Sequence, residues 1–107
     1  MAGDYRIGEM VVEADDWLAE RRLNELHLSR EGVLVLGIHP IDGDFIGTPV
    51  SETRIHVGDR LILYGKSTQL TELSERRHGL SGFLAHQDAV LEHQELLEEQ
   101  VAQIDGQ

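Results

Sequence analysis

Two short apolar runs, at 33–38 and 60–65, stand out from the mixed pattern of the rest of the chain. The first joins leucine and β-branched residues without a charged interruption and is closed by Pro40, and the second has the same character after Arg60. Runs of this length and composition are typical of strands, because a free-standing helix needs a longer segment. We therefore predict two central strands, each buried on both faces.

Turn-forming residues follow the first of these strands. An Asp-Gly pair at 42–43 adopts positive φ at low cost, so residues 45–46 are predicted to return as the second arm of a hairpin. Pro49 cannot donate a hydrogen bond to a neighbouring strand, and we expect the polar connection 47–54 to leave the sheet there. Connections of this kind are where ligand contacts concentrate.

A second turn precedes the second strand. We expect Gly58 to hold a backbone angle that is costly for any residue with a Cβ, and Asp59 to accept hydrogen bonds from nearby backbone N–H groups. After the strand, Ser67 or Thr68 is predicted to be the N-cap of a short helix over 69–76.

The N-terminal part is predicted to supply outer packing elements. Alternating apolar and polar residues over 6–14 indicate an outer strand. Trp17 follows in a predicted packed corner, and we interpret it as a core or interface anchor in preference to a ligand-stacking side chain. Residues 22–27 fit a short helix with Leu23 and Leu26 on one face.

The C-terminal part differs in composition from the rest. Residues 76–82, with two glycines and several polar side chains, are typical of a linker. The spacing after it predicts an acidic helix over 85–104, which we expect to dock on the domain or to pair with its counterpart in a dimer, the alternative being a frayed tail. Its narrow apolar seam, which Gln94 interrupts, consists of Val90, Leu97, Val101 and Ile104.

Composition and charge narrow the range of functions. The 107 residues are enough for one domain with a tail, and a hydrophobic content of 40% can fill one small core. No apolar run approaches the roughly 20 residues that cross a bilayer, so the chain as given is not expected to span a membrane. A net charge of −11 argues against binding to nucleic acid or anionic lipid. All nine basic residues precede position 83, which leaves room for a local anion site.

No motif supplies catalytic chemistry. The chain has no cysteine, which excludes thiolate metal sites and cysteine nucleophiles, and it lacks Gly-x-Gly-x-x-Gly and nucleophile-elbow patterns. The six histidines show no close metal-ligand spacing. His86 and His93, with Glu92 nearby, would suit a metal shared across a dimer, but we favour the interpretation that they are solvated surface residues. We therefore expect no enzymatic activity, no cofactor and no metal.

The ordered series of motifs resembles the RCK C-terminal (TrkA-C) domain family over roughly Arg6 to Arg77. Its most specific part is the run acidic-Thr-x-Ile-x-x-Gly-Asp-x-Leu-x-x-x-Gly at 52–65, whose glycines and aspartate lie at turns before a core strand. The matching segments are Val11–Ala14, Leu18–Ala19, Leu23–Leu26, Gly32–Ile38, Asp42–Gly43, Pro49, Thr53–Ile55, Val57–Asp59 and Leu61–Gly65.

The resemblance implies an α+β fold with a small β-sheet and two short helices, and the acidic helix predicted from the residue pattern follows it. We therefore divide the chain into a disordered start (1–5), a TrkA-C-like domain (6–77), and a linker with an acidic amphipathic helix (78–107). The nucleotide-binding half that usually precedes this domain in the family is not in the sequence. Chains of this type often follow transmembrane helices, so we expect a domain excised from a longer protein.

In function, the resemblance implies a cytoplasmic, ligand-sensing regulatory homodimer of a potassium or other cation transport system. Its partner is expected to be a transporter or channel subunit of an inner membrane, upstream in the same chain or separate. Some family members bind cyclic di-AMP in the dimer cleft, but His39 stands where many relatives carry an arginine, which argues against a dianionic ligand. The alternative is an interaction or dimerisation module without a small-molecule ligand. The positions that match the cleft are His27, Leu28, Arg30, Val33, Leu34 and Pro49, of which Arg30 is the obvious phosphate partner.

Overall fold

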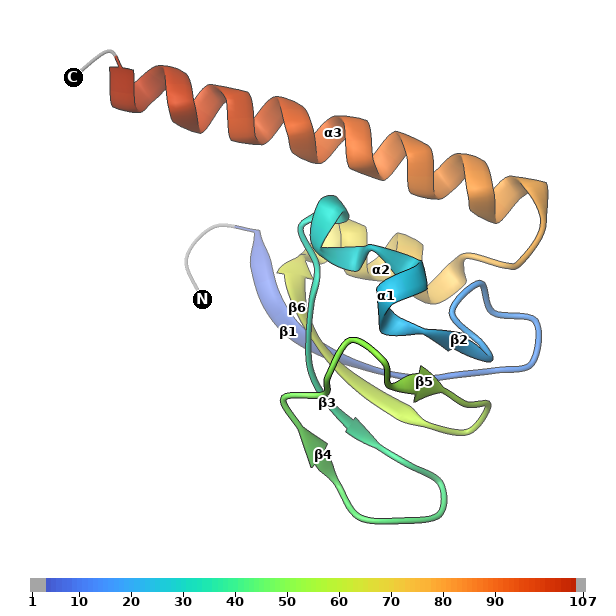
Figure 1. The fold of residues 1–107 in the computed structure, drawn as a ribbon. Helices are drawn as coiled ribbons and strands as arrows, with labels where there is room; N and C mark the ends of the chain where they lie inside the picture. The colour runs from blue at the N-terminus through green and yellow to red at the C-terminus, as the bar shows by residue number, and fades with distance from the viewer. Residues whose placement is uncertain (1–3, 106–107) are drawn as a thin grey trace.

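The computed structural model describes residues 4–105 and has the predicted α+β fold, in which a long helix crosses above a small antiparallel sheet (Figure 1). The N-terminal Met1–Gly3, part of the expected disordered start, lies outside the described residues, whereas Tyr5 already belongs to a strand. The elements in chain order are β1 (Tyr5–Val11), β2 (Arg21–Arg22), α1 (Leu23–Leu26), the 3-10 helix η1 (Leu28–Glu31), β3 (Leu34–His39), β4 (Ile46–Gly47), β5 (Arg54–Ile55), β6 (Arg60–Lys66), α2 (Ser67–Glu75) and α3 (Leu80–Asp105).

The main sheet has four antiparallel strands in the order β1-β6-β3-β4. The two predicted central strands are β3 and β6, which pair with each other, and β1 is an edge strand as expected. The predicted hairpin is present because Ile38 of β3 pairs with Ile46 of β4. A second sheet, which was not predicted, pairs β2 with β5 and brings the end of the polar connection beside the segment that precedes α1.

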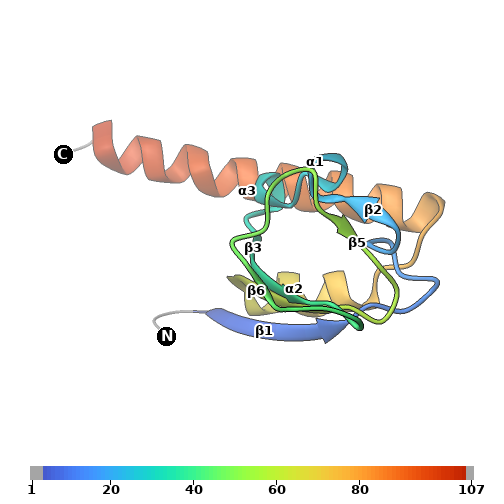
Figure 2. The ribbon, with the colours of Figure 1, turned by 60° about the horizontal axis from the view of Figure 1, so that its bottom comes forward.

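The central strands are covered on one face only, so the prediction of burial on both faces is wrong. In β6, Leu61 and Leu63 are buried, whereas Ile62 and Tyr64 are half-buried. In β3, Leu34 is 51% exposed. Figure 2 shows the reason, because the sheet lies at the lower edge of the molecule with the helices on one side of it. The outer face of the sheet therefore has no covering layer within one copy of the described residues.

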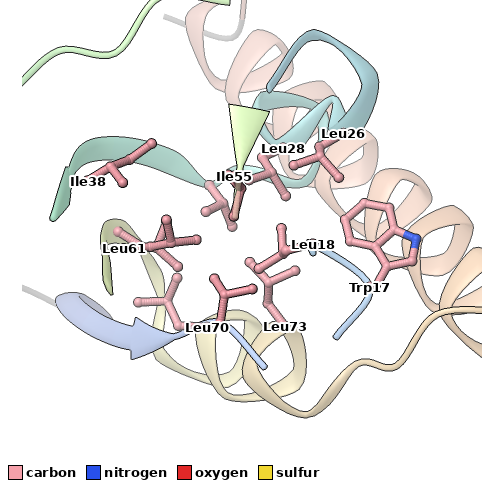
Figure 3. Close-up of a cluster of buried hydrophobic side chains, with 12 residues drawn as sticks. Trp17, Leu18, Leu26, Leu28, Ile38, Ile55, Leu61, Leu70 and Leu73 are labelled. Atoms are coloured by element: carbon pink, nitrogen blue, oxygen red, sulfur yellow. The ribbon is translucent and has the colours of Figure 1, made fainter. Parts of the chain in front are cut away.

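The hydrophobic core fills the space between the inner face of the sheet and the helical segments (Figure 3). Trp17 is 6% exposed, in agreement with its interpretation as a core anchor, and Leu26 of α1 is fully buried beside it. Burial of a leucine of this kind contributes about 1.5–3 kcal/mol relative to leaving it exposed. The core residues are Val12, Trp17, Leu18, Leu26, Leu28, Val33, Ile38, Ile55, Leu61, Leu63, Leu70 and Leu73.

The turn before β6 has the predicted chemistry. Gly58 has φ +93°, in the region that favours glycine. The buried carboxylate of Asp59 accepts hydrogen bonds from the backbone N–H of His56 at 2.8 Å and of Ile41 at 3.3 Å. The side chain of Asp59 thus fixes both the turn and the loop that follows β3. The sequence predicted this role for the turn alone.

The helix boundaries after β6 differ from the prediction. Lys66 is the N-cap of α2 and makes no side-chain capping bond, so the expected cap at Ser67 or Thr68 is wrong. The strand runs directly into the helix, and the backbone N–H of Ser67 donates to the carbonyl of Asp4 at 2.7 Å instead. The last helix begins at Leu80, five residues before the predicted start, which shortens the predicted linker to residues 76–79.

The first half of α3 docks on the domain, one of the two arrangements expected for this helix. Ala89 is buried, and α3 makes most of its contacts with η1. Figure 1 shows the second half projecting past the sheet without an element beneath it. The molecule is correspondingly elongated, with principal extents of 50 × 30 × 23 Å.

Candidate functional site

A groove of about 300 Å³ lies between α1, η1 and the start of β3. His27, with φ 49° and ψ 43°, turns the chain between α1 and η1, and Gly32, with φ 78°, turns it again before β3. These two turns bring η1 to face the first residues of β3. The lining of the groove includes His27, Leu28, Ser29, Val33, Leu34 and Ser51.

Four of the six predicted ligand-binding residues line this groove, namely His27, Leu28, Val33 and Leu34. Leu28 and Val33 are also core residues, with 5% and 1% of their surface exposed, so they form its floor. Leu34 and His27 are the members of this set with accessible side chains. The groove therefore has an apolar floor and a rim that joins a leucine to an imidazole.

The other two predicted residues lie outside the groove of a single copy. Arg30 lines an adjoining hollow of about 640 Å³, which shares His27 with the groove and lies between η1, the corner at Trp17 and the first turns of α3. Pro49 is half-buried in the connection after β4, and Ser51, two residues further on, lines the groove in its place. A ligand held in the groove of one copy consequently meets no arginine among the lining residues.

The groove adjoins an open strand edge. β4 pairs with Gly37 and Ile38 only, and the backbone N–H of Thr48 donates to the carbonyl of Leu36 at 3.2 Å. Among the described residues no strand pairs with Leu34 or Val35 on that side. The apolar side chain of Leu34 and a free backbone edge are thus presented together, which is a surface suited to a second chain or a ligand.

A buried ionic cluster holds η1 from the opposite side. The guanidinium of Arg76 donates two hydrogen bonds to the carboxylate of Glu31, at 2.7 and 2.9 Å, and both side chains are shielded from solvent. Arg76 also bonds Glu72 of α2, with Nε to Oε2 at 3.1 Å. Gln69 adds a donor to Glu31 at 2.8 Å. Because each group is satisfied, the cluster ties η1 to α2 rather than leaving buried charge unpaired.

The pKa of Arg76 follows from these contacts. Burial on its own would lower the pKa of Arg76, but its hydrogen bonds to Glu31 and Glu72 outweigh this effect and hold the pKa above its ordinary value. The guanidinium is therefore charged at every pH at which the domain is folded. The cluster is a permanent structural tie with no acid-base role for Arg76.

The cluster also reaches α3 through His86. Its Nδ1 donates to Glu31 at 2.5 Å, and its ring stacks on Trp17 with centroids 5.1 Å apart. Arg76 lies over the same indole ring at 4.6 Å. The expectation that His86 is a solvated surface residue is wrong, because its side chain is 14% exposed and engaged on both sides. One carboxylate on η1 thus joins α2 and α3.

Sequence reasoning missed this cluster for a physical reason. Arg76 was interpreted as the first residue of a linker, and its partner Glu31 is 45 residues away. A basic residue next to glycines has no local signal of burial. Glu31 gives no signal either, because it follows Arg30 and precedes Gly32, a polar context in which a carboxylate is ordinarily exposed.

The described residues contain one group of carboxylates with metal-ligand spacing, Glu13, Asp15 and Asp16. Asp16 already accepts from the backbone N–H of Glu13 at 2.8 Å and from the guanidinium of Arg77 at 2.7 Å. These bonds account for the burial of Asp16 as a loop cap. None of the helices within residues 4–105 combines the length and the apolar character needed to cross a bilayer.

The match to a family model identifies the class of the domain. The model of the TrkA-C domain matches residues 7–77, so the chain belongs to the TrkA-C domain family, as the motif order predicted. The matched region begins within β1 and ends at Arg77. It therefore includes the groove and most of the ionic cluster. A search among curated proteins finds no matching sequence.

Solved structures with a similar fold include RCK domains and a channel. The chain "GsuK channel bound to NAD" has 24% identity and a TM-score of 0.55, covering 67% of this chain and 13% of that one. The RCK C domain of the potassium transport protein KtrA in complex with cyclic di-AMP has 22% identity and a TM-score of 0.55, covering 67% and 82%. The RCK_C domain dimer of Streptococcus agalactiae BusR in complex with cyclic di-AMP has 21% identity and a TM-score of 0.53, covering 64% and 92%. At these identities the likeness shows the fold alone.

Proposed function

We propose that this TrkA-C domain is a ligand-sensing regulatory module of a potassium or other cation transport system, acting in the cytoplasm as a homodimer. Family membership supports the regulatory role, and two structures of similar fold are RCK C domains in complex with cyclic di-AMP. The present chain spans 13% of the length of the GsuK channel chain, in which a domain of this fold is part of a channel protein. By analogy, we propose a membrane transporter or channel subunit as the partner of this domain.

The observation that carries the ligand proposal is the groove beside the open edge of β3. Its floor is apolar, and Leu34 projects from a strand segment that has no partner on that side among the described residues. Two copies that approach with these edges would enclose a cleft with apolar walls, which suit the purine rings of a cyclic dinucleotide. His27 and Ser29 at the rim supply hydrogen-bond donors for its phosphates.

In this proposal the ligand-binding set is His27, Leu28, Arg30, Val33, Leu34 and Pro49. Arg30 and Pro49 lie outside the groove of one copy, so their contribution depends on a ligand that spans two copies. A charge-assisted bond from Arg30 to a phosphate would add about 1.5–3 kcal/mol, more than a neutral hydrogen bond. The effect of removing Arg30 therefore tests the shared cleft, whereas the effect of altering Leu34 tests the groove itself.

Calorimetric titration with cyclic di-AMP is the direct test. We expect saturable binding by the unmodified chain and its loss in Leu34→Glu, because a carboxylate at the rim of the groove repels phosphate and disfavours the apolar walls. Val57→Glu is the matched control, since Val57 is also exposed but lies in the turn between β5 and β6. Absence of heat with the unmodified chain at about 100 μM ligand would exclude the affinity expected of a specific site.

One observation favours a second candidate, an interaction module without a small-molecule ligand. The groove volume of about 300 Å³ is at the lower limit of the volumes typical of ligand pockets, and the lining of the groove includes no arginine or lysine. In that case the edge of β3 and Leu34 would serve for protein contact alone. Leu34→Glu would then weaken self-association measured by sedimentation, while cyclic di-AMP would have no effect on it.

A further inference from the structure

Helix α3 carries an apolar seam that is separate from the face docked on the domain. The docked face is built from His86, Ala89 and His93, which lie against η1. His86 bonds Glu31 at 2.5 Å, Ala89 is 6% exposed, and the ring of His93 is so close to Gly32 that a Cβ there would meet its Nδ1 at 2.7 Å. After the half-buried Leu96 every side chain through Ile104 is exposed.

The seam follows two strict heptad series. Phe83, Val90, Leu97 and Ile104 are spaced seven residues apart, and so are Leu80, Gln87, Gln94 and Val101. The two series are offset by three and four residues, which places them on one stripe of the helix as the a and d positions of a coiled coil. Leu97, Val101 and Ile104 are 44%, 56% and 69% exposed, so the second half of this stripe has no partner within the described chain, whereas Val90, nearer the domain, is half-buried.

The end of α3 has little stability of its own. Residues 97–104 form about two turns that touch no other element, and isolated helices of fewer than about 12 residues are marginal in water. Only their continuity with the docked half supports them in a single copy. Covering the seam would stabilise these turns by burying three large apolar side chains.

We propose that the seam pairs with the same seam of a second copy, as a parallel, in-register, two-stranded coiled coil. The charge pattern favours a second copy although α3 is strongly acidic. Asp88, Glu92, Glu95 and Glu99 fall on a third face, away from the seam. One flank of the seam carries the heptad series Leu84, Leu91, Glu98 and Asp105, so acids flank its C-terminal part only. Two seams therefore meet without bringing acid against acid at their core.

The two glutamines select the register. In a parallel, in-register pair Gln87 faces Gln87 and Gln94 faces Gln94, and each amide both donates to and accepts from its counterpart. An apolar partner would leave these amides without hydrogen bonds, at a cost that disfavours it. Single polar residues at a positions are known to fix the register and the two-stranded state of coiled coils. The residues that interrupt the apolar pattern thus specify the partner.

Cysteine crosslinking tests the pairing, and the chain is suited to it because it contains no cysteine. In Val101→Cys the Cα atoms of the two cysteines of a parallel pair would lie within the separation that a disulfide allows, about 4.4–6.8 Å. Glu99→Cys is the matched control on the acidic face. We expect Val101→Cys to form disulfide-linked dimers on the order of tenfold faster than Glu99→Cys during mild oxidation. Equal rates would overturn the proposal and leave the seam to a heterologous partner.

A second variant tests whether the apolar seam itself brings the two cysteines together. Adding Leu97→Glu to Val101→Cys places like charges one turn away in both copies, and crosslinking should fall to the rate of Glu99→Cys. An unchanged rate would contradict the pairing. The outcome is independent of the proposed ligand, because Leu97 is not among the residues that line the groove: if crosslinking fails while cyclic di-AMP still binds, the seam proposal alone is overturned.

Discussion

Removing Arg76 should be the most destabilising single change in the ionic cluster. Arg76→Met leaves Glu31 buried with His86 and Gln69 as its remaining partners, and Glu31 has no exposed side-chain surface. Breaking a buried ion pair from one side costs about 3–5 kcal/mol, which is a large share of the roughly 5–15 kcal/mol stability of a typical domain. With a urea m-value of about 1–3 kcal/mol/M, the unfolding midpoint should fall by about 2 M.

The neighbouring arginine is the matched control. Arg77 also pairs with carboxylates, at 2.7 Å to Asp16 and 3.4 Å to Asp15, but its side chain is 43% exposed. Exposed pairs contribute about 0–1 kcal/mol. Arg77→Met should shift the midpoint less than Arg76→Met, because the buried Asp16 keeps the hydrogen bond from the backbone N–H of Glu13. Urea unfolding followed by far-UV circular dichroism measures both variants under identical conditions.

The double variant decides whether unpaired charge is the cause. Replacing both partners, in Arg76→Met with Glu31→Met, removes the buried charge as well as its counterion, so it should be less destabilising than Arg76→Met alone. Arg76→Lys keeps the charge but not the two parallel hydrogen bonds, and should lie between the unmodified chain and Arg76→Met. A cost for Arg76→Met no greater than that for Arg77→Met would refute the reasoning.

Three further changes test the turns and the packing. Gly58→Val should cost about 1 kcal/mol or more, because Gly58 has φ +93°; an unchanged melting temperature would exclude the assigned turn. Gly82→Ala should loosen the start of α3, since a Cβ there would meet the carbonyl oxygen of Arg77 at 2.1 Å, and faster amide hydrogen exchange over the first turns of α3 is the expected result. Trp17→Ala should cost about 3–5 kcal/mol in thermal unfolding, and a cost near zero would contradict its place in the core.

The sequence predicted the parts of the fold that local patterns control. The strands β3 and β6, the hairpin between β3 and β4 and the turn at Gly58 each depend on residues adjacent in sequence, and all were confirmed. Burial of both faces of the strands was wrong because periodicity cannot show which layers will cover a sheet. Leu34 and Leu61 look alike in sequence, yet one is exposed and the other buried.

The candidate site was predictable only where the family match supplied it. His27, Leu28, Val33 and Leu34 lie within eight residues of one another, so two turns suffice to bring them together. Arg30 lies between them in sequence but points around η1 into another hollow, because a 3-10 helix separates the directions of neighbouring side chains.

The ionic cluster could not be predicted from local sequence. Glu31, Arg76 and His86 come from three separate elements, and their contact depends on the docking of α3. The sequence showed the helix and its possible docking but not the face that would be used. Only tertiary packing decides that the His86 face contacts η1 while the heptad seam stays exposed.

An NMR titration of the isotopically labelled chain with cyclic di-AMP tests the central claim most directly, because it reports the site as well as the binding. We predict that the largest amide shifts occur at residues 27–35 and 49–51. The same pattern should weaken in Leu34→Glu and persist in Val57→Glu. No shifts at saturating ligand, or shifts confined to residues outside the groove, would contradict the account.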